Sequence, residues 1–296
     1  MGETTGPSSD RDIPTRMLVL GVAHHDGTIQ AAEVAPVAEA CGHSPEQVRS
    51  CLRRLVAEGL FVRDGAGRGA VYRPTEAGMA ALTTFASRTR LAFVQDRAGQ
   101  AWDQRWHLVA FAVPETRRAA RDALRDHLGA IGGAPIQSGL YVSPHPWDKD
   151  VHAEAARLGI TGHVSLASTD DLAVGAVTEP AELARELWPV TEIAARYAAF
   201  VDTWRDVADE LEAKRTRSER LPEFAFLAGA LAMGVAFQAC FAEDPLLPPE
   251  LLPHPWPGRA ARDLVLRSRR VALEIRAEHE RPALFRGFDD LIEALP

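Results

Sequence analysis

The segment Ser44–Gly59, SPEQVRSCLRRLVAEG, predicts a helix whose two ends and two faces are all defined. Ser44 can accept a hydrogen bond from a first-turn amide as the N-cap, and Pro45 suits the first helical position because its missing N–H has no intrahelical partner there. Gln47 follows the cap by three residues, where its side chain can complete a capping box. Gly59 ends the helix.

The faces of this predicted helix have different chemistry. Apolar residues recur with the helical period and form one face, which must be buried: Val48, Cys51, Leu52, Leu55 and Val56. The opposite face is polar and mostly basic: Gln47, Arg49, Ser50, Arg53 and Arg54. A chain with this helix therefore needs a core on one side of it and leaves arginines on the other.

The surroundings of the helix predict a winged helix-turn-helix. Two further helices are expected before it, over 13–24 and 31–41. Two short strands are expected after it, over 61–63 and 70–73, joined by the glycine-rich turn at 64–69. A helix over 75–94 then leaves the wing.

This arrangement predicts an interface for double-stranded DNA, with the helix in a major groove and the wing on the backbone or in the minor groove. The predicted contacts are Ser44, Gln47, Arg49, Ser50, Arg53 and Arg54 of the helix and Arg63, Arg68 and Arg73 of the wing. Two alternatives stay open: an ordinary amphipathic helix with solvated arginines, and a winged helix that binds protein.

The charge distribution limits where nucleic acid could bind. The net charge is −8, yet residues 1–97 are neutral, with eleven Arg and eleven Asp or Glu. Within 44–75 six Arg stand against three acidic residues. Affinity for DNA must therefore come from this local patch, while the acidic remainder opposes non-specific adhesion.

The sequence otherwise indicates a cytoplasmic protein without a membrane segment. No run of 18 uninterrupted apolar residues occurs. The three cysteines, Cys41, Cys51 and Cys240, are an odd number without metal-ligand spacing, and the first two are expected as buried thiols on helices.

The middle of the chain predicts a ferredoxin-like α/β sandwich with one strand unassigned. A polar break at 96–100 precedes it. Strands are expected over 107–113, 136–143 and 163–167, and helices over 114–129 and 151–158.

From residue 179 the pattern is helical, with helices expected over 181–187, 190–211, 221–241 and 259–277, and an ordered proline-rich loop over 244–258. We expect the side chains of Phe224, Phe226, Leu227, Leu231, Phe237 and Phe241 in the core of this part. The fold class is therefore α+β multidomain: a winged helix-turn-helix (13–97), a ferredoxin-like domain (98–178) and a helical domain (179–296).

The sequence indicates neither an enzyme nor a cofactor. It has no Gly-x-Ser-x-Gly elbow, no phosphate-binding Gly-Lys-Ser/Thr loop and no dinucleotide fingerprint after a strand. The turn at 24–27 contains two histidines and an aspartate, and His145, His152 and His163 are scattered over the central domain. We expect a solvated turn and isolated surface histidines, with no metal site.

Aromatic residues with interposed arginines are the candidates for an effector site at a domain junction. They are Trp102, Arg105, Trp106, Trp188, Arg196, Tyr197 and Trp204. The alternative is that aromatic residues at helical spacing simply form the core.

Four segments in order, SPEQVRSCLRRLVAEGLF, WDQRWHLVAFAVPE, IQSGLYVSP and DPLLPPELLPHPWPG, resemble the PaaX-like family of bacterial transcription regulators, named for the repressor of phenylacetic acid degradation. The resemblance implies a homodimeric repressor of a catabolic operon, released by a small-molecule effector such as an aryl-acyl-CoA thioester. Gln238-Ala239-Cys240 departs from the pattern, because a basic residue is expected shortly before the Asp-Pro. If that residue holds an anionic ligand, its absence puts CoA binding in doubt.

The central segment also looks like the small CRISPR-associated nucleases, which hold a metal with an aspartate near the end of the first strand. The corresponding positions here are Phe111, Ala112 and Val113. Because no carboxylate stands there, the metal has no obvious ligand. A metal-dependent nuclease built on the central domain is therefore our second hypothesis, and a transcription regulator is the first.

Overall fold

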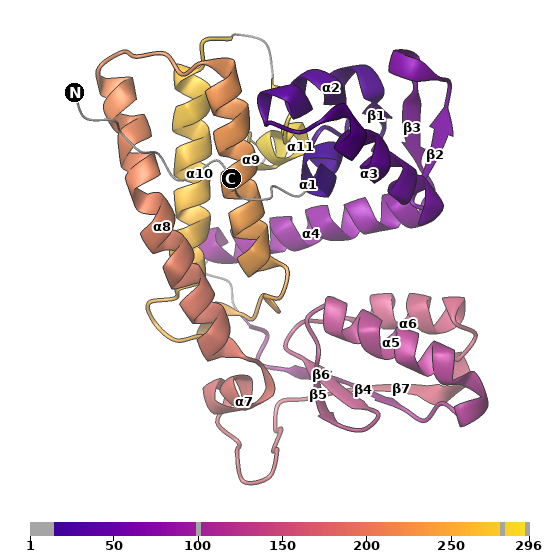
Figure 1. The fold of residues 1–296 in the computed structure, drawn as a ribbon. Coiled ribbons are helices and arrows are strands. Elements are labelled where there is room, and N and C mark those ends of the chain that lie inside the picture. Colours follow the sequence, from indigo (N-terminus) through magenta and orange to yellow (C-terminus); the bar gives the residue numbers. More distant parts are fainter. Residues whose placement is uncertain (1–14, 99–101, 279–281, 294–296) are drawn as a thin grey trace. The chain divides into compact units, whose positions relative to one another are not determined.

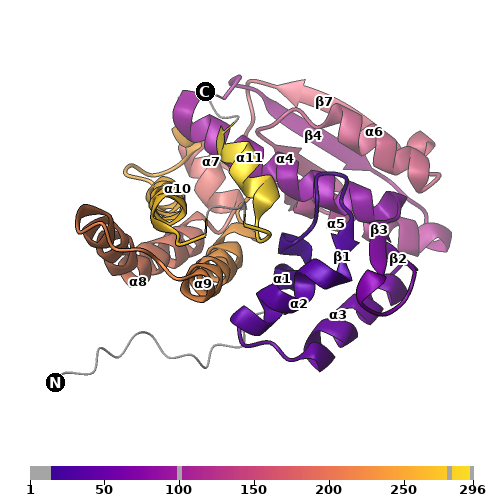
Figure 2. The same ribbon diagram turned by 90° about the horizontal axis from the view of Figure 1, so that it is seen from above.

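The computed structural model describes residues 15–98, 102–278 and 282–293, which fall into two compact units (Figures 1 and 2). Unit 1 consists of the chain up to Arg90, Asp202–Ala239 and the chain from Arg262. Unit 2 consists of Leu91–Val201 and Cys240–Ala261. Each unit is assembled from separate segments, whereas the predicted domains are continuous, and the domain limits stay a prediction.

The first part of unit 1 alternates helices with a small sheet. Its elements are α1 (Thr15–Gly21), β1 (Ile29–Gln30), α2 (Ala31–Ala40), α3 (Pro45–Ala57), β2 (Phe61–Asp64), the 3-10 turn η1 (Gly67–Gly69), β3 (Val71–Pro74) and the part of α4 (Glu76–Ala98) up to Arg90, after which α4 belongs to unit 2. The strands form an antiparallel sheet in the order β1-β3-β2, with Tyr72 opposite both Ile29 and Arg63. The strand β1 was not predicted, because two residues carry no periodic pattern.

The core of unit 1 joins these elements to the C-terminal helices. Val48, Cys51, Leu52 and Leu55 are buried as predicted, together with Phe226, Leu227, Leu231 and Leu284. Val56 was predicted in the core but is 36% exposed. At 100° per residue it lies at the edge of the apolar face of α3. Cys41 was also expected to be buried and is only half-buried, and desolvation raises the pKa of its thiol to about 11.

The C-terminal helices are α8 (Val190–Thr216), α9 (Glu223–Phe241), α10 (Pro257–Ile275) and α11 (Arg286–Glu293), and α8, α9 and α10 lie side by side (Figures 1 and 2). Phe224 was predicted in the core but is 65% exposed, at the first turn of α9. The helix α9 is long and apolar enough to cross a membrane, but the core helix of a soluble protein can have the same length and composition. Its side chains Phe226, Leu227 and Leu231 pack in the core of unit 1.

Unit 2 contains a four-stranded sheet with two helices on one face (Figure 1). In chain order the elements are β4 (Trp106–Phe111), η2 (Glu115–Arg117), α5 (Arg118–Ala130), β5 (Ala134–Gln137), β6 (Leu140–Ser143), α6 (Asp148–Arg157), η3 (Thr161–His163) and β7 (Val164–Thr169). The strand order is β5-β6-β4-β7, and every neighbouring pair is antiparallel. Leu124 and Leu128 of α5 and Val151 of α6 pack on Val109 and Tyr141 of the sheet.

Two expectations for this region are wrong. The single strand over 136–143 is a hairpin of β5 and β6, which turns at Gly139. Gly139 has a φ of 77°, and a Cβ there would come within 2.6 Å of the carbonyl oxygen of Phe111, so the turn needs glycine. The polar break expected at 96–100 does not begin at Asp96, because α4 continues to Ala98; residues 99 and 100 lie outside the described part of the chain.

The remainder of unit 2 is α7 (Pro180–Leu187), the first part of α8 and the proline-rich segment with η4 (Pro249–Leu251). That segment is an ordered loop, as expected, with Leu246, Leu247 and Leu251 buried. It approaches so closely that a Cβ on Gly132 would lie 2.6 Å from the carbonyl oxygen of Pro245. Apolar burial, and not local periodicity, therefore fixes this loop.

Candidate nucleic-acid interface

The N-terminus of α3 is closed by the predicted capping box. The Gln47 amide donates to Ser44 Oγ at 3.3 Å, and the Ser44 amide donates to Gln47 Oε1 at 2.7 Å. Both side chains are therefore engaged in the cap. For DNA, Ser44 keeps its hydroxyl hydrogen and one lone pair of Oγ, and Gln47 keeps its NH2 and one lone pair of Oε1.

We expect the Ser44→Ala variant to lower the free energy of unfolding by about 1 kcal/mol, because a first-turn N–H loses its acceptor. The change is measured by urea denaturation. Ser87→Ala is the matched control, since Ser87 is exposed within α4. An equal loss in the two variants would contradict a specific role of the cap.

The outward face of α3 presents three arginines to solvent. Arg49, Arg53 and Arg54 are exposed, and Ser50 is half-buried. Arg49 pairs with Glu46 one turn earlier, with both side chains more than half exposed. An exposed ion pair of this kind contributes little free energy, so Arg49 can exchange its partner for a phosphate or a base.

The hairpin of β2 and β3 presents the other predicted arginines. Arg63 lies on β2, Arg68 in η1 and Arg73 on β3, and all three are exposed. Arg73 Nε is 3.8 Å from Asp64 Oδ2 across the hairpin. The structure thus places all nine predicted contacts on α3, its N-cap and the adjoining hairpin of unit 1.

The predicted effector residues are divided between the two units. Trp102, Trp106 and Trp188 form a chain of ring contacts in unit 2, with centroids 5.0 Å apart for the first pair and 6.2 Å for the second. Trp106 and Trp188 are buried. Because their rings fill space against each other, they act as core residues.

The other four members of the effector set have separate surroundings. Arg105 contacts Ser168 Oγ at 2.9 Å, Tyr197 donates to Asp244 Oδ2 at 2.8 Å, and Arg196 pairs with Glu243. Trp204 belongs to unit 1, whereas the rest belong to unit 2. An effector role for these residues stays a prediction.

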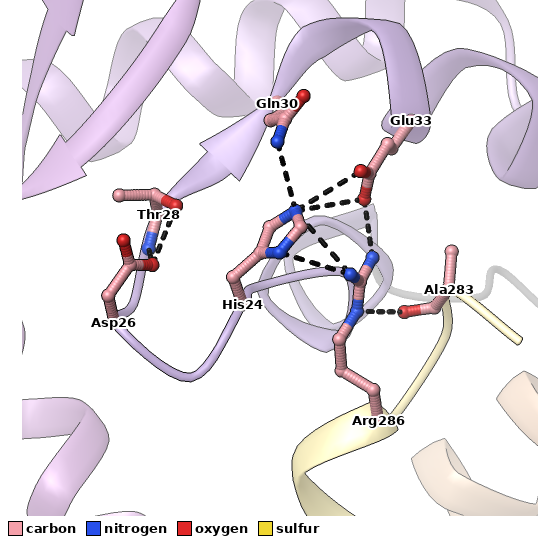
Figure 3. A network of polar contacts seen from close by, with 7 residues as sticks. All are labelled: His24, Asp26, Thr28, Gln30, Glu33, Ala283 and Arg286. Carbon is pink, nitrogen blue, oxygen red and sulfur yellow. Dashed lines mark hydrogen bonds and ion pairs between the residues drawn. The ribbon is translucent and has the colours of Figure 1, made fainter. Parts of the chain in front are cut away.

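The turn at 24–27 connects α11 to the first helices (Figure 3). His24 Nε2 lies 3.1 Å from Glu33 Oε2, and Arg286 contacts both His24 Nδ1, at 3.1 Å, and Glu33. His25 Nε2 lies 3.0 Å from Asp290 Oδ2. His25 and Asp26 are exposed, as expected of a solvated turn, whereas His24 is half-buried in contact with Glu33 and Arg286. The sequence analysis missed Arg286, since 262 residues separate it from His24.

Among the described residues no group of three His, Cys, Asp or Glu could hold a metal ion. At the end of β4 the backbone amides of Phe111 and Ala112 donate to Gly139 and His163, and no carboxylate stands between them. These positions offer nothing to the nuclease hypothesis.

Three family profiles match this chain in order. They are described as PaaX-like protein (residues 16–78), PaaX protein central Cas2-like domain (residues 99–184) and PaaX-like protein C-terminal domain (residues 188–280). The chain belongs to the PaaX-like family. The resemblance that the four sequence segments carry is thereby confirmed.

Two further proteins are similar to this PaaX-like chain. "Transcriptional repressor PaaX" from Escherichia coli (strain K12) is 28% identical over 247 residues, which cover 83% of this chain and 74% of the relative. An uncharacterized protein from Mycobacterium tuberculosis with a solved structure is 22% identical, with a TM-score of 0.47, and the match covers 88% of this chain and 94% of that one.

Proposed function

We propose that this PaaX-like protein is a DNA-binding transcriptional repressor. The observation that carries the proposal is the exposed arginine face of α3, whose opposite face is anchored in the core of unit 1. The order of α1, β1, α2, α3, β2 and β3 supports a winged helix-turn-helix around this face. The name of the Escherichia coli relative, a transcriptional repressor, supports the same function.

In this proposal α3 enters a major groove, which is wide enough for a helix, and Arg49 and Arg53 contact base edges or phosphates. Arg63, Arg68 and Arg73 of the hairpin contact the backbone or the minor groove. Because base contacts discriminate sequence and phosphate contacts do not, α3 sets the operator and the wing adds affinity.

The second element of the proposal is a homodimer, which the family resemblance implies. The order β-α-β-β-α-β, with the sheet order β5-β6-β4-β7, supports a ferredoxin-like fold. In a symmetric dimer the two α3 helices meet half-sites about 34–36 Å apart, or a multiple of it. The protein would act in the cytoplasm, where its DNA is, and would not be an enzyme.

The third element of the proposal is release from DNA by a small molecule. An effector acts only to the extent that it binds one arrangement of the dimer more tightly than the other. The family resemblance implies an aryl-acyl-CoA thioester. The segment Gln238-Ala239-Cys240 adds no cation for it, because none of its three side chains is basic.

A mobility-shift and footprint experiment on DNA upstream of the gene and its neighbours tests this proposal. We expect a discrete protected palindrome. With six to ten phosphate contacts, affinity should fall by about 10³–10⁵ between 50 and 200 mM salt, because bound counterions are released. Absence of protection at low salt on all of these promoters would overturn the proposal, and association insensitive to salt would indicate a protein partner instead.

A further inference from the structure

A cavity of about 240 Å³ lies within unit 2. The second half of α4 forms one wall through Leu91 and Val94, and Trp102 and Pro248 contribute further apolar surface. The loop around His145 closes another side. The walls are thus mainly aliphatic and aromatic, and the few polar groups among them decide what the cavity can hold.

The first polar group is the His145 ring. Its Nε2 lies 2.7 Å from the carbonyl oxygen of Leu246, which can only accept, so Nε2 carries the hydrogen. Burial lowers the pKa of His145 and keeps the ring neutral. In a neutral ring with a hydrogen on Nε2, the other nitrogen, Nδ1, is an acceptor. Within the described part of the chain this atom has no hydrogen-bond partner.

The second and third polar groups are also acceptors. Gln95 Nε2 donates to the same Leu246 carbonyl oxygen at 3.2 Å, which leaves its Oε1 as an acceptor. The Asp103 carboxylate accepts from the Arg105 amide at 2.9 Å and lies 3.1 Å from His107 Nε2. Among the described lining residues there is neither Lys nor Arg. The cavity therefore favours hydrogen-bond donors and disfavours anions.

We propose that this cavity binds a single-ring aromatic molecule that carries a hydrogen-bond donor and no negative charge, such as a phenol or an arylalkylamine. A cavity of about 150 Å³ holds benzene, so the present volume leaves room for a short substituent. Pockets for larger ligands span about 300–1,000 Å³, so this one is too small to enclose a whole CoA thioester. The role of the bound molecule as the effector of the repressor rests on the proposed function.

The cavity is connected to α8 by hydrogen bonds. His145 and Gln95 both hold the carbonyl of Leu246, a non-glycine residue with a φ of 58°. The Leu246 amide donates to Asp244 Oδ1 at 2.8 Å, and the other oxygen of Asp244 accepts from Tyr197 of α8 at 2.8 Å. A ligand that moves His145 or Gln95 would thus shift Leu246, whose backbone is strained and which is linked to α8 through Asp244. Ligand binding could in this way favour one position of α8 over another.

Isothermal titration calorimetry with phenol, benzylamine and phenylacetate tests the proposal on the full-length protein. We expect phenol and benzylamine to bind, and phenylacetate to bind at least about tenfold more weakly, because of the Asp103 charge. Asp103→Asn keeps one acceptor oxygen, replaces the other by an NH2 donor and removes the charge, so it should reduce the preference for benzylamine over phenylacetate by about tenfold. Asp150→Asn, at an exposed position of α6, is the matched control and should leave the preference unchanged.

Filling the cavity separates this site from binding elsewhere. Val94→Phe should abolish binding of all three compounds without removing a hydrogen bond, and Leu91→Trp repeats the test if the first variant fails to fold. Saturable binding that persists in a folded, filled variant would overturn the proposal, as would absence of binding of every compound to the wild type. DNA binding is measured separately by mobility shift: a wild type that binds DNA but no probe refutes the cavity alone, and one that binds a probe but no DNA refutes the repressor alone.

Discussion

Replacing Arg49 and Arg53 together with alanine is expected to weaken operator binding by about 2–6 kcal/mol, since each base contact contributes about 1–3 kcal/mol. The two residues are four apart on α3, so both side chains lie on the same outward face. Both are exposed, and the only ion pair that the structure shows for them among its described residues is the exposed one between Arg49 and Glu46. Their replacement should therefore lower the affinity for DNA and leave the core intact. A mobility shift at fixed salt measures the loss.

The matched control is the double variant Arg118→Ala, Arg185→Ala, which removes the same charge from exposed positions of α5 and α7 in unit 2. It should change operator binding by much less, because neither residue belongs to the proposed interface. The assignment of the DNA interface to α3 is wrong if the α3 variant binds the operator as tightly as the wild type does. It is equally wrong if both double variants lose affinity to the same extent.

The helix α3 was predictable because its signals are local. Ser44, Pro45 and Gln47 define its start within four residues, and its apolar period defines the buried face. The positions of the outward arginines follow from that face alone. The same local pattern predicted the capping box of Ser44 and Gln47, and both residues were also predicted as DNA contacts.

The hairpin of β5 and β6 was missed although a local signal existed. Ser138-Gly139 is a two-residue turn of the kind that joins antiparallel strands, yet the alternation over 136–143 reads equally well as one strand. The helix α11 was not predicted, because it has only eight residues and so only about two turns of periodic pattern. Its stability comes from packing and ion pairs with distant segments, and not from propensity.

From the sequence alone, the aromatic residues could be the walls of an effector pocket or part of the core, and both alternatives stayed open. Trp106 and Trp188 were predicted as pocket walls and are buried against each other, while Trp204 lies in the other unit. The polar groups of the cavity, His145 and Gln95, converge on Leu246 from 101 and 151 residues away. No spacing in the sequence could bring them together, because the packing of the proline-rich loop does so.

Replacing Asp289 with alanine is expected to lower the free energy of unfolding by about 3–5 kcal/mol, because it leaves the Arg269 charge buried without a partner. Both oxygens of Asp289 accept from Arg269 at 2.8 Å, and the two side chains are 6% and 7% exposed. Arg269 also donates to the Leu284 carbonyl and lies over the Phe226 ring. Urea denaturation measures the loss as a lower midpoint at an unchanged slope.

Asp209→Ala is the control, since its pair with Arg267 is exposed and should contribute less than about 1 kcal/mol. Adding Arg269→Met to Asp289→Ala should recover much of the lost stability, because the unpaired charge then disappears. If the two single variants lose the same stability, the buried pair does not hold α11. If the buried pair does hold it, loosening α11 also frees the Phe285 amide from the Gly21 carbonyl and Arg286 from His24, and thereby weakens the support of the DNA-binding helices.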